Sequence, residues 1–338
     1  MTSRERVLKT LNHEEVDRFP KELWALAGVW MHRSEEFKEV NKLIEFDTAY
    51  APIVYGASPY ATPFTGEVGK YTDDFGSEWT VGEPGVAGEV TRPVIDDWSR
   101  LDSYKMPNEM LDNIDTSKVS EFYANTDKFV LGGSHVRPFE RLQFMRGTEN
   151  LFMDMAYGEA SFLKLKDMLF EFECRNLEIL TGLDVDQIRF MDDWGTQRAL
   201  LIDPEMWREY FKPMYKKYVE IIHKGGKKAF FHSDGFIEAI YPDLIEIGVD
   251  SLNSQLFCMD AEKIIDTYGD KITFWGEIDR QFVLPFGTIS DVDAAVDRIA
   301  GAVMKKHGKR TGAVAQCEWG VHDPKENVIE VFKRWDEK

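Results

Sequence analysis

Apolar and polar positions follow two alternating patterns from about residue 129 to the end of the chain. Short apolar runs, typical of buried strands, are separated by longer stretches in which apolar residues recur every three or four positions, as on one face of a helix. The predicted strands are residues 129–133, 187–191, 228–231, 249–252, 272–275 and 312–316, and the clearest helices are 204–224 and 292–306. Strands that alternate with helices predict a parallel sheet.

Two further segments, near residues 22–24 and 48–55, can supply the strands that an eight-stranded barrel still needs. The chain is therefore predicted to be an α/β protein with the (β/α)8 TIM-barrel fold. A doubly wound open sheet is the competing architecture. No Gly-x-Gly-x-x-Gly follows any of the predicted strands, so the usual dinucleotide signature of that architecture is missing.

Residues 56–95 break the regular pattern, because glycines, aromatic and β-branched residues alternate there with turn signals. This composition predicts hairpins or an irregular β insertion near the N-terminus. A length of 338 residues suits a barrel that forms a single domain, so we expect one domain over residues 1–338 with this insertion inside it.

Composition narrows the classes of partner. The formal net charge of −19 disfavours nucleic acid and anionic membranes. Three widely spaced cysteines argue against a disulfide framework, and no apolar window has the length of a signal sequence or membrane span. We expect a soluble cytoplasmic protein.

Polar and aromatic residues gather where the predicted strands end, which is where barrels carry their catalytic groups. The catalytic candidates are Asp192, Asp193 and Glu277. The candidates for substrate binding are His135, Arg137, Trp194, Asn253, Trp275 and Trp319.

A metal site is the sharpest chemical prediction. His232 and Asp234 are two residues apart at the end of a strand, so their side chains point to the same side. Cys317 follows another strand, and a barrel would bring it to the same mouth. These three residues, with Glu277 as a further carboxylate, could bind zinc and leave a coordination position open. Taken singly, a histidine is more often a hydrogen-bonded core residue and a cysteine a small buried apolar one.

Other candidates have equally plain structural explanations. Asp192 and Asp193 could orient a substrate or share a proton, or could cap a helix and face solvent at a turn. The three tryptophans could wall a wide apolar pocket or pack in the barrel mouth. The basic cluster of Arg137, Arg141 and Arg146 could hold an anion or pair with acids such as Glu140.

Motifs along nearly the whole chain resemble those of the uroporphyrinogen decarboxylase superfamily, which also contains zinc-dependent methyltransferases that act with corrinoid proteins. The motifs are Arg4-Glu5-Arg6-Val7-Leu8, Asp17-Arg18-Phe19-Pro20, Asp73-Asp74-Phe75-Gly76, Asp192-Asp193-Trp194-Gly195-Thr196-Gln197, Asp203-Pro204-Glu205, His232-Ser233-Asp234-Gly235, Glu246-Ile247-Gly248-Val249-Asp250, Trp275-Gly276-Glu277-Ile278-Asp279 and Asp323-Pro324-Lys325-Glu326-Asn327-Val328.

The resemblance favours the methyltransferase branch. True decarboxylases carry Arg-Gln-Ala-Gly-Arg-Tyr near the N-terminus, whereas residues 26–33 here lack that motif, and they have a histidine where this chain has Cys317. The methyltransferase branch has His-x-Cys and a downstream cysteine. By this likeness His232 and Cys317 would be zinc ligands, with Asp234 in place of the first thiol.

The resemblance thus implies a zinc-dependent methyltransferase that moves a methyl group between a small-molecule donor or thiol acceptor and a corrinoid carried by a partner protein. Members of the superfamily are often dimers, so a homodimer is an expectation. Two alternatives remain open: a decarboxylase-like lyase for a carboxylated substrate, which would use Arg137 and the acidic pair, and a non-catalytic protein that binds a corrinoid or tetrapyrrole.

Overall fold

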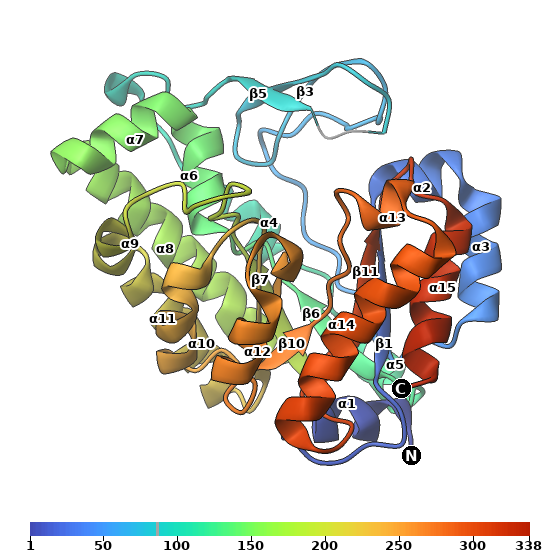
Figure 1. The fold of residues 1–338 in the computed structure, drawn as a ribbon. Helices are drawn as coiled ribbons and strands as arrows, with labels where there is room; N and C mark the ends of the chain where they lie inside the picture. Colours follow the sequence, from blue (N-terminus) through green and yellow to red (C-terminus); the bar gives the residue numbers. More distant parts are fainter. Residues whose placement is uncertain (86–87) are drawn as a thin grey trace.

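Eight parallel strands form a nearly closed barrel in the computed structural model, which describes residues 1–85 and 88–338 (Figure 1). Around the barrel the strands run in the order β1-β11-β10-β9-β8-β7-β6-β2. Their bounds are β1 (Lys21–Ala25), β2 (Thr48–Tyr50), β6 (Phe129–Gly133), β7 (Gln187–Met191), β8 (Lys228–Ser233), β9 (Ser251–Ser254), β10 (Thr273–Trp275) and β11 (Ala313–Trp319). The predicted TIM barrel is confirmed.

Helices follow the strands and lie on the outside of the barrel, apart from α1, which precedes β1 and lies at the bottom of the barrel (Figure 1). They are α1 (Ser3–Leu11), α2 (Ala27–His32), α3 (Ser34–Leu43), α4 (Glu109–Asp112), α5 (Val119–Ala124), α6 (Pro138–Arg146), α7 (Thr148–Tyr157), α8 (Ala160–Thr181), α9 (Pro204–Tyr210), α10 (Lys212–Lys224), α11 (Tyr241–Glu246), α12 (Ala261–Tyr268), α13 (Val283–Phe286), α14 (Ile289–His307) and α15 (Lys325–Asp336). Within the described residues, none of them combines the length and apolar character needed to cross a bilayer.

The predicted helix 204–224 is two helices in the structure, α9 and α10. Pro213 lies in the first turn of α10. Its ring removes a backbone donor and clashes with the preceding turn, so the chain turns at Phe211 instead of continuing as one helix. The apolar spacing continues across this break and gave no sign of it.

A buried carboxylate joins β1 to β2, the two strands at the ends of the strand order. The side chain of Asp47 accepts hydrogen bonds from Arg6 (2.6 Å), from Arg18 (2.6 Å) and from the backbone N–H of Lys21 (2.7 Å). The backbone N–H of Asp47 also donates to the carbonyl of Lys21 at 2.8 Å. The N-terminal motifs that carry Arg6 and Arg18 thus close the barrel.

The barrel interior is filled from below by α1. Val7 and Leu11 of this helix belong to one buried cluster with Phe129, Phe230 and Trp275, which point inward from the strands. Burying each aliphatic side chain is worth about 1.5–3 kcal/mol. A second, larger cluster fills the layer between strands and helices.

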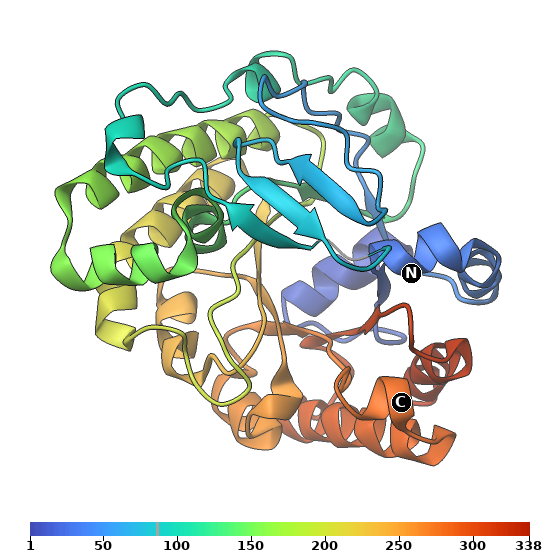
Figure 2. The same cartoon turned by 90° about the horizontal axis from the view of Figure 1, so that it is seen from above.

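The predicted β insertion is present as a three-stranded antiparallel sheet of β3 (Gly69–Thr72), β4 (Glu78–Val81) and β5 (Glu89–Arg92). Figure 2 shows it in front of the barrel when the molecule is seen from above. Asp73, in its first turn, accepts a hydrogen bond from Arg141 of α6 at 3.2 Å. The sheet therefore lies on the side of the barrel where β6 ends.

Candidate functional site

Two loops cross at the mouth of the barrel, and two glycines allow them to touch. A Cβ atom on Gly195, after β7, would lie 2.3 Å from the backbone N of Phe236, and one on Gly235, after β8, would lie 2.1 Å from the carbonyl oxygen of Gly195. Gly235 also has φ +80°, a conformation that side chains disfavour. The crossing brings together Asp193 and Asp234, which precede these glycines.

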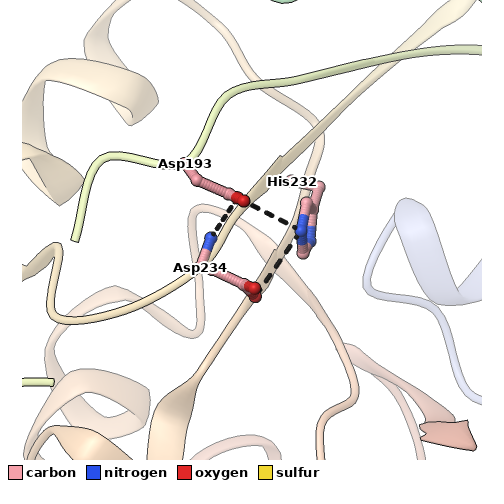
Figure 3. A group of neighbouring side chains, drawn as sticks. All are labelled: Asp193, His232 and Asp234. Carbon is pink, nitrogen blue, oxygen red and sulfur yellow. Dashed lines mark hydrogen bonds and ion pairs between the residues drawn. The ribbon is translucent and has the colours of Figure 1, made fainter. Parts of the chain in front are cut away.

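His232 completes a group of three potential metal ligands with these two aspartates (Figure 3). Its Nε2 lies 3.5 Å from Asp193 Oδ1 and 3.6 Å from Asp234 Oδ1. The backbone N–H of Asp234 donates to Asp193 Oδ1 at 2.9 Å, which fixes one carboxylate against the other loop. The imidazole is buried, being 5% exposed.

The hydrogen bonds of Asn253 set the tautomer of His232. The amide nitrogen of Asn253 donates to the carbonyl oxygen of Trp275 (2.5 Å) and to Gln316 Oε1 (3.2 Å), so its oxygen faces His232 Nδ1, at 2.5 Å. Nδ1 must therefore carry a proton. In the neutral imidazole the lone pair is then on Nε2, which faces the two carboxylates.

This geometry fits a tetrahedral divalent ion. Bonds of about 2.1 Å to zinc place neighbouring ligand atoms about 3.4 Å apart, close to the two distances from His232 Nε2. Asp234 Oδ1 is buried and has no hydrogen-bond partner among the described residues. A nitrogen lone pair and carboxylate oxygens that converge in this way form a donor set that zinc accepts, with a fourth position left for another ligand.

Arg280 lies beside this group and contacts three carboxylates. Its guanidinium donates short hydrogen bonds to Asp234 and Glu318, and its Nε lies 3.4 Å from Glu277 Oε1. Burial raises the pKa of Glu277 well above its usual range, against the opposing effect of Arg280. Gly276 places Glu277 here: a Cβ atom on this glycine would lie 2.2 Å from Gln316 Oε1.

A cavity of about 310 Å³ opens next to His232 inside the barrel. Its wall is largely apolar, with Trp24, Phe190, Met191 and Phe230, and Glu318 is at its rim beside His232 in the lining. This volume is at the low end of the range for small-molecule sites, about 300–1,000 Å³.

The floor of the cavity is a buried ion pair. Arg189 donates two hydrogen bonds to Glu22, at 2.9 and 2.7 Å, and one to the hydroxyl of Tyr50 at 2.9 Å. Its guanidinium also lies 4.3 Å from the ring centre of Phe230. The charge at this floor is thus already neutralised.

Comparisons with known proteins place this barrel in a family. A sequence model described as uroporphyrinogen decarboxylase (URO-D) matches residues 72–335, which is more than half of the chain. The chain belongs to the uroporphyrinogen decarboxylase family. A search of curated proteins gives no match.

Among solved structures, a methyltransferase from Methanosarcina mazei is similar to this family member over 100% of this chain and 99% of its own, with a TM-score of 0.73 and 16% identity. A xylanase from Gloeophyllum trabeum matches 90% of this chain and 85% of its own at 10% identity and a TM-score of 0.44, which supports no inference. At such identities the likenesses concern the fold. The family resemblance seen in the sequence motifs is confirmed.

The thiol of this family member is not where the sequence argument put it. Cys317 is 0% exposed and packs in the cluster between strands and helices, outside the group of Asp193, His232 and Asp234. Its neighbour Glu318 lines the cavity instead. Because side chains alternate along a strand, Cys317 points away from the barrel interior. The expected pairing of Cys317 with His232 is thus corrected to a pairing of His232 with two aspartates.

The three tryptophans predicted as pocket walls are all 0% exposed and line none of the cavities described above. Trp194 stacks on Phe139 with ring centres 4.0 Å apart, Trp319 donates to the carbonyl of Asp323, and Trp275 donates to Glu22. Their apolar packing explains this placement. Asn253 is also buried and orients His232, so the structure gives it no direct path to a substrate.

The two aspartates of the acidic pair have different surroundings. Asp192 is 0% exposed and accepts hydrogen bonds from the backbone N–H groups of Phe139 and Glu140, both at 2.7 Å. It therefore caps the first turn of α6 but is buried instead of facing solvent, and it is not among the residues that line the cavity. Asp193, predicted only as a catalytic residue, is in the group of three potential metal ligands.

The three arginines of the basic cluster also differ in their surroundings. Arg146 pairs with Asp154 at 2.7 Å and Arg141 with Asp73 at 3.2 Å. The nearest carboxylate oxygen to Arg137 belongs to Glu140, at 3.7 Å, and its guanidinium contacts the sulfur of Met191, a residue of the cavity wall. His135 packs edge-on against Tyr55, and burial lowers its pKa to about 4.

Sequence reasoning missed Arg280, Arg189 and Glu22, and it placed Glu318 among the residues at the strand ends without giving it a role. Glu318 and Arg189 lie within or directly after predicted strands, on the side of the strand that faces the barrel. Strand parity was therefore the signal that could have found them. Arg280 lies in an irregular loop, and its partners could not be read from spacing.

Proposed function

We propose that this protein is a zinc-dependent methyltransferase that moves a methyl group between a small molecule and a corrinoid carried by a partner protein. The observation that supports it is the convergence of His232 Nε2 with Asp193 and Asp234 next to the apolar cavity. The structural neighbour named as a methyltransferase agrees with this assignment.

The ligand set bears on how the metal would act. Two carboxylates and an imidazole leave zinc a stronger Lewis acid than thiolates would, because thiolates donate more charge. When bound, zinc would supply Lewis acidity toward an oxygen or nitrogen of the methyl donor. This favours activation of the donor over storage of a thiolate.

Residues of the chain would orient the metal ligand and hold the methyl donor. Asn253 holds the ring of His232 through Nδ1 and so keeps Nε2 available. Trp24 and Phe230 would hold the apolar part of the donor, and the buried pair of Glu22 and Arg189 would close the space beneath it. The open mouth of the barrel would give a corrinoid of the partner protein access to the methyl group. The donor atom would keep the electron pair of the broken bond and would be protonated from solvent.

Metal binding is the first test. We expect the wild type to bind one zinc ion per chain after dialysis against zinc, measured by elemental analysis and calorimetry. His232→Gln should weaken zinc binding by more than about 100-fold, and Asn253→Ala by about 10–100-fold, as second-sphere partners do. His322→Gln, at a side chain that is 81% exposed, is the control and should bind like the wild type.

Methyl transfer is the second test. Free cob(I)alamin would be mixed with the zinc-loaded protein and a panel of O-methyl and N-methyl donors, and methylcobalamin would be followed by its absorbance. Turnover should disappear in His232→Gln. A wild type that binds no zinc under any loading condition would contradict the proposal, and tight corrinoid binding without turnover would favour a non-catalytic binding protein.

A decarboxylase-like lyase is the second candidate, and Arg137 favours it. Among the described residues, the nearest carboxylate oxygen to its guanidinium is that of Glu140, at 3.7 Å, and the guanidinium contacts Met191 of the cavity wall. Such a group could hold a substrate carboxylate. Release of carbon dioxide that persists with a chelator present, and stops in Arg137→Gln, would decide for the lyase.

A further inference from the structure

Arg280 occupies a position that a metal ion could take. Its guanidinium is surrounded by Asp234, Glu277 and Glu318, and its side chain is 18% exposed. These carboxylates come from three different strand ends, after β8, β10 and at β11. Such a set, brought together from distant parts of the chain, is the kind that holds divalent ions.

One of the three carboxylates is incompletely satisfied. Glu277 is 3% exposed, and its Oε2 has no hydrogen-bond partner among the described residues. A cavity of about 40 Å³, enough for one or two small species, borders Glu277 and Arg280. The acid group thus has both an unused oxygen and adjacent space.

Asp234 belongs to both groups. Its Oδ2 accepts from Arg280, whereas its Oδ1 faces His232 Nε2 at 3.6 Å. Arg280 therefore keeps one oxygen of Asp234 away from the proposed zinc position and leaves the other available. A shared carboxylate of this kind is how two-metal sites are bridged, at metal separations of about 3.5–4 Å.

We propose that Arg280 determines the stoichiometry of the site: its guanidinium fills the pocket formed by Asp234, Glu277 and Glu318, so the barrel mouth takes one divalent ion instead of two. This rests on the proposed zinc site for the first ion, whereas two of the three carboxylates of the second pocket, Glu277 and Glu318, lie outside that site. Arg280 acts through Asp234 and is a positioning residue.

The test counts ions. Metal-free protein would be titrated with Co²⁺ by calorimetry, with the visible absorption of bound cobalt as a second readout. We expect one ion in the wild type and two in Arg280→Met, which keeps an unbranched side chain but removes the guanidinium group and its charge. Arg280→Lys should stay at one ion, because an ammonium group still fills the pocket.

Two further variants make the result specific. Arg280→Met combined with Glu318→Gln should return to one ion, because the second ion loses a ligand. Arg298→Met removes the same charge from an exposed pair with Glu262 and should bind one ion. If Arg280→Met does not fold, Arg280→Gln provides the same measurement.

The outcomes separate this inference from the zinc proposal. One ion in both the wild type and Arg280→Met, with unchanged cobalt spectrum, would overturn the role of Arg280 and leave the zinc site intact. No ion in the wild type and one in Arg280→Met would support the acid pocket and contradict the zinc site. No ion in either protein would overturn both.

Discussion

Glu173 of α8 shows how far burial alone can change a single residue. It is 1% exposed and accepts hydrogen bonds from the hydroxyl of Tyr218 and from the backbone N–H of Arg137 at 3.0 Å. Burial raises the pKa of Glu173 to about 8, although these donors and the nearby arginines act in the opposite direction. At neutral pH the folded protein therefore keeps a proton that the unfolded chain releases.

This difference predicts a pH-dependent stability. Because the folded pKa is raised, the wild type is most stabilised by this group below about pH 4.5 and loses that contribution as pH rises through about 8. Glu173→Gln cannot titrate. The free energy of unfolding of the wild type, relative to Glu173→Gln, should fall by up to about 4 kcal/mol between these limits, as measured by urea unfolding at several pH values.

Glu178→Gln is the matched control for that experiment, because it makes the same change at an exposed position of the same helix. The difference between the wild type and this control should not vary with pH. A flat difference for Glu173→Gln as well would show that its carboxyl group is ionised in the folded protein.

For single residues, the sequence predicted which residue types form the site better than it predicted where their side chains point. His232 and Asp234 were found because they are two residues apart at a strand end. Cys317 was misplaced because its strand parity was not read: it shares a side with Ala313 and Ala315, whereas Gln316 and Glu318 are on the opposite side. Alternation along that strand carried the answer.

The loops after β7 and β8 act as one element, held by the contact between Gly195 and Gly235. Three backbone hydrogen bonds accompany it: Gly195 N–H to Asp234 at 3.0 Å, Phe236 N–H to Thr196 at 2.7 Å and Asp192 N–H to His232 at 3.0 Å. The backbone positions of Asp193 and Asp234 therefore depend on the packing of the two loops, in addition to the hydrogen bonds of their side chains.

Gly235→Ala should separate the two loops and so weaken metal binding. Its Cβ would overlap the backbone of Gly195, and its φ of +80° adds about 1 kcal/mol of strain. We expect a drop in zinc affinity of at least tenfold by calorimetry. Gly308→Ala is the control: its φ is +68°, but its Cβ would meet nothing within 4 Å, so it should lose stability only and bind zinc normally.

Helices and strands were predicted where the apolar periodicity was strong. The residues at which they begin and end were not. The six strands read from the apolar runs are all present, and the segments near 22–24 and 48–55 contain β1 and β2. The break at Phe211 was missed although Pro213 signals it in the sequence. The two crossing loops escaped prediction because they depend on contacts between distant segments.

The whole barrel depends on the seam between β1 and β2, where Asp47 joins three donors. Asp47→Asn would leave Arg6 and Arg18 without their buried charge partner. Loss of one partner of a buried pair costs about 3–5 kcal/mol, so we expect a decrease of that size in the free energy of unfolding by urea.

Asp17→Asn is the comparison for this prediction. Asp17 pairs with the same Arg6, but its side chain is 47% exposed. An exposed pair contributes about 1 kcal/mol or less, so this variant should lose little. Equal losses of unfolding free energy in the two variants would show that the buried ion pairs of Asp47 stabilise the barrel no more than an exposed pair does.

Arg189, paired with Glu22, lines the cavity, and α1 fills the barrel interior at its other end. A small ligand would therefore enter and leave through the end where the strands finish. A partner protein bound over that end would retain a small molecule already in the cavity and would block the entry of another. Binding would then follow a compulsory order, with the small molecule first and the partner protein second. An excess of partner protein would inhibit the reaction by binding before the small molecule.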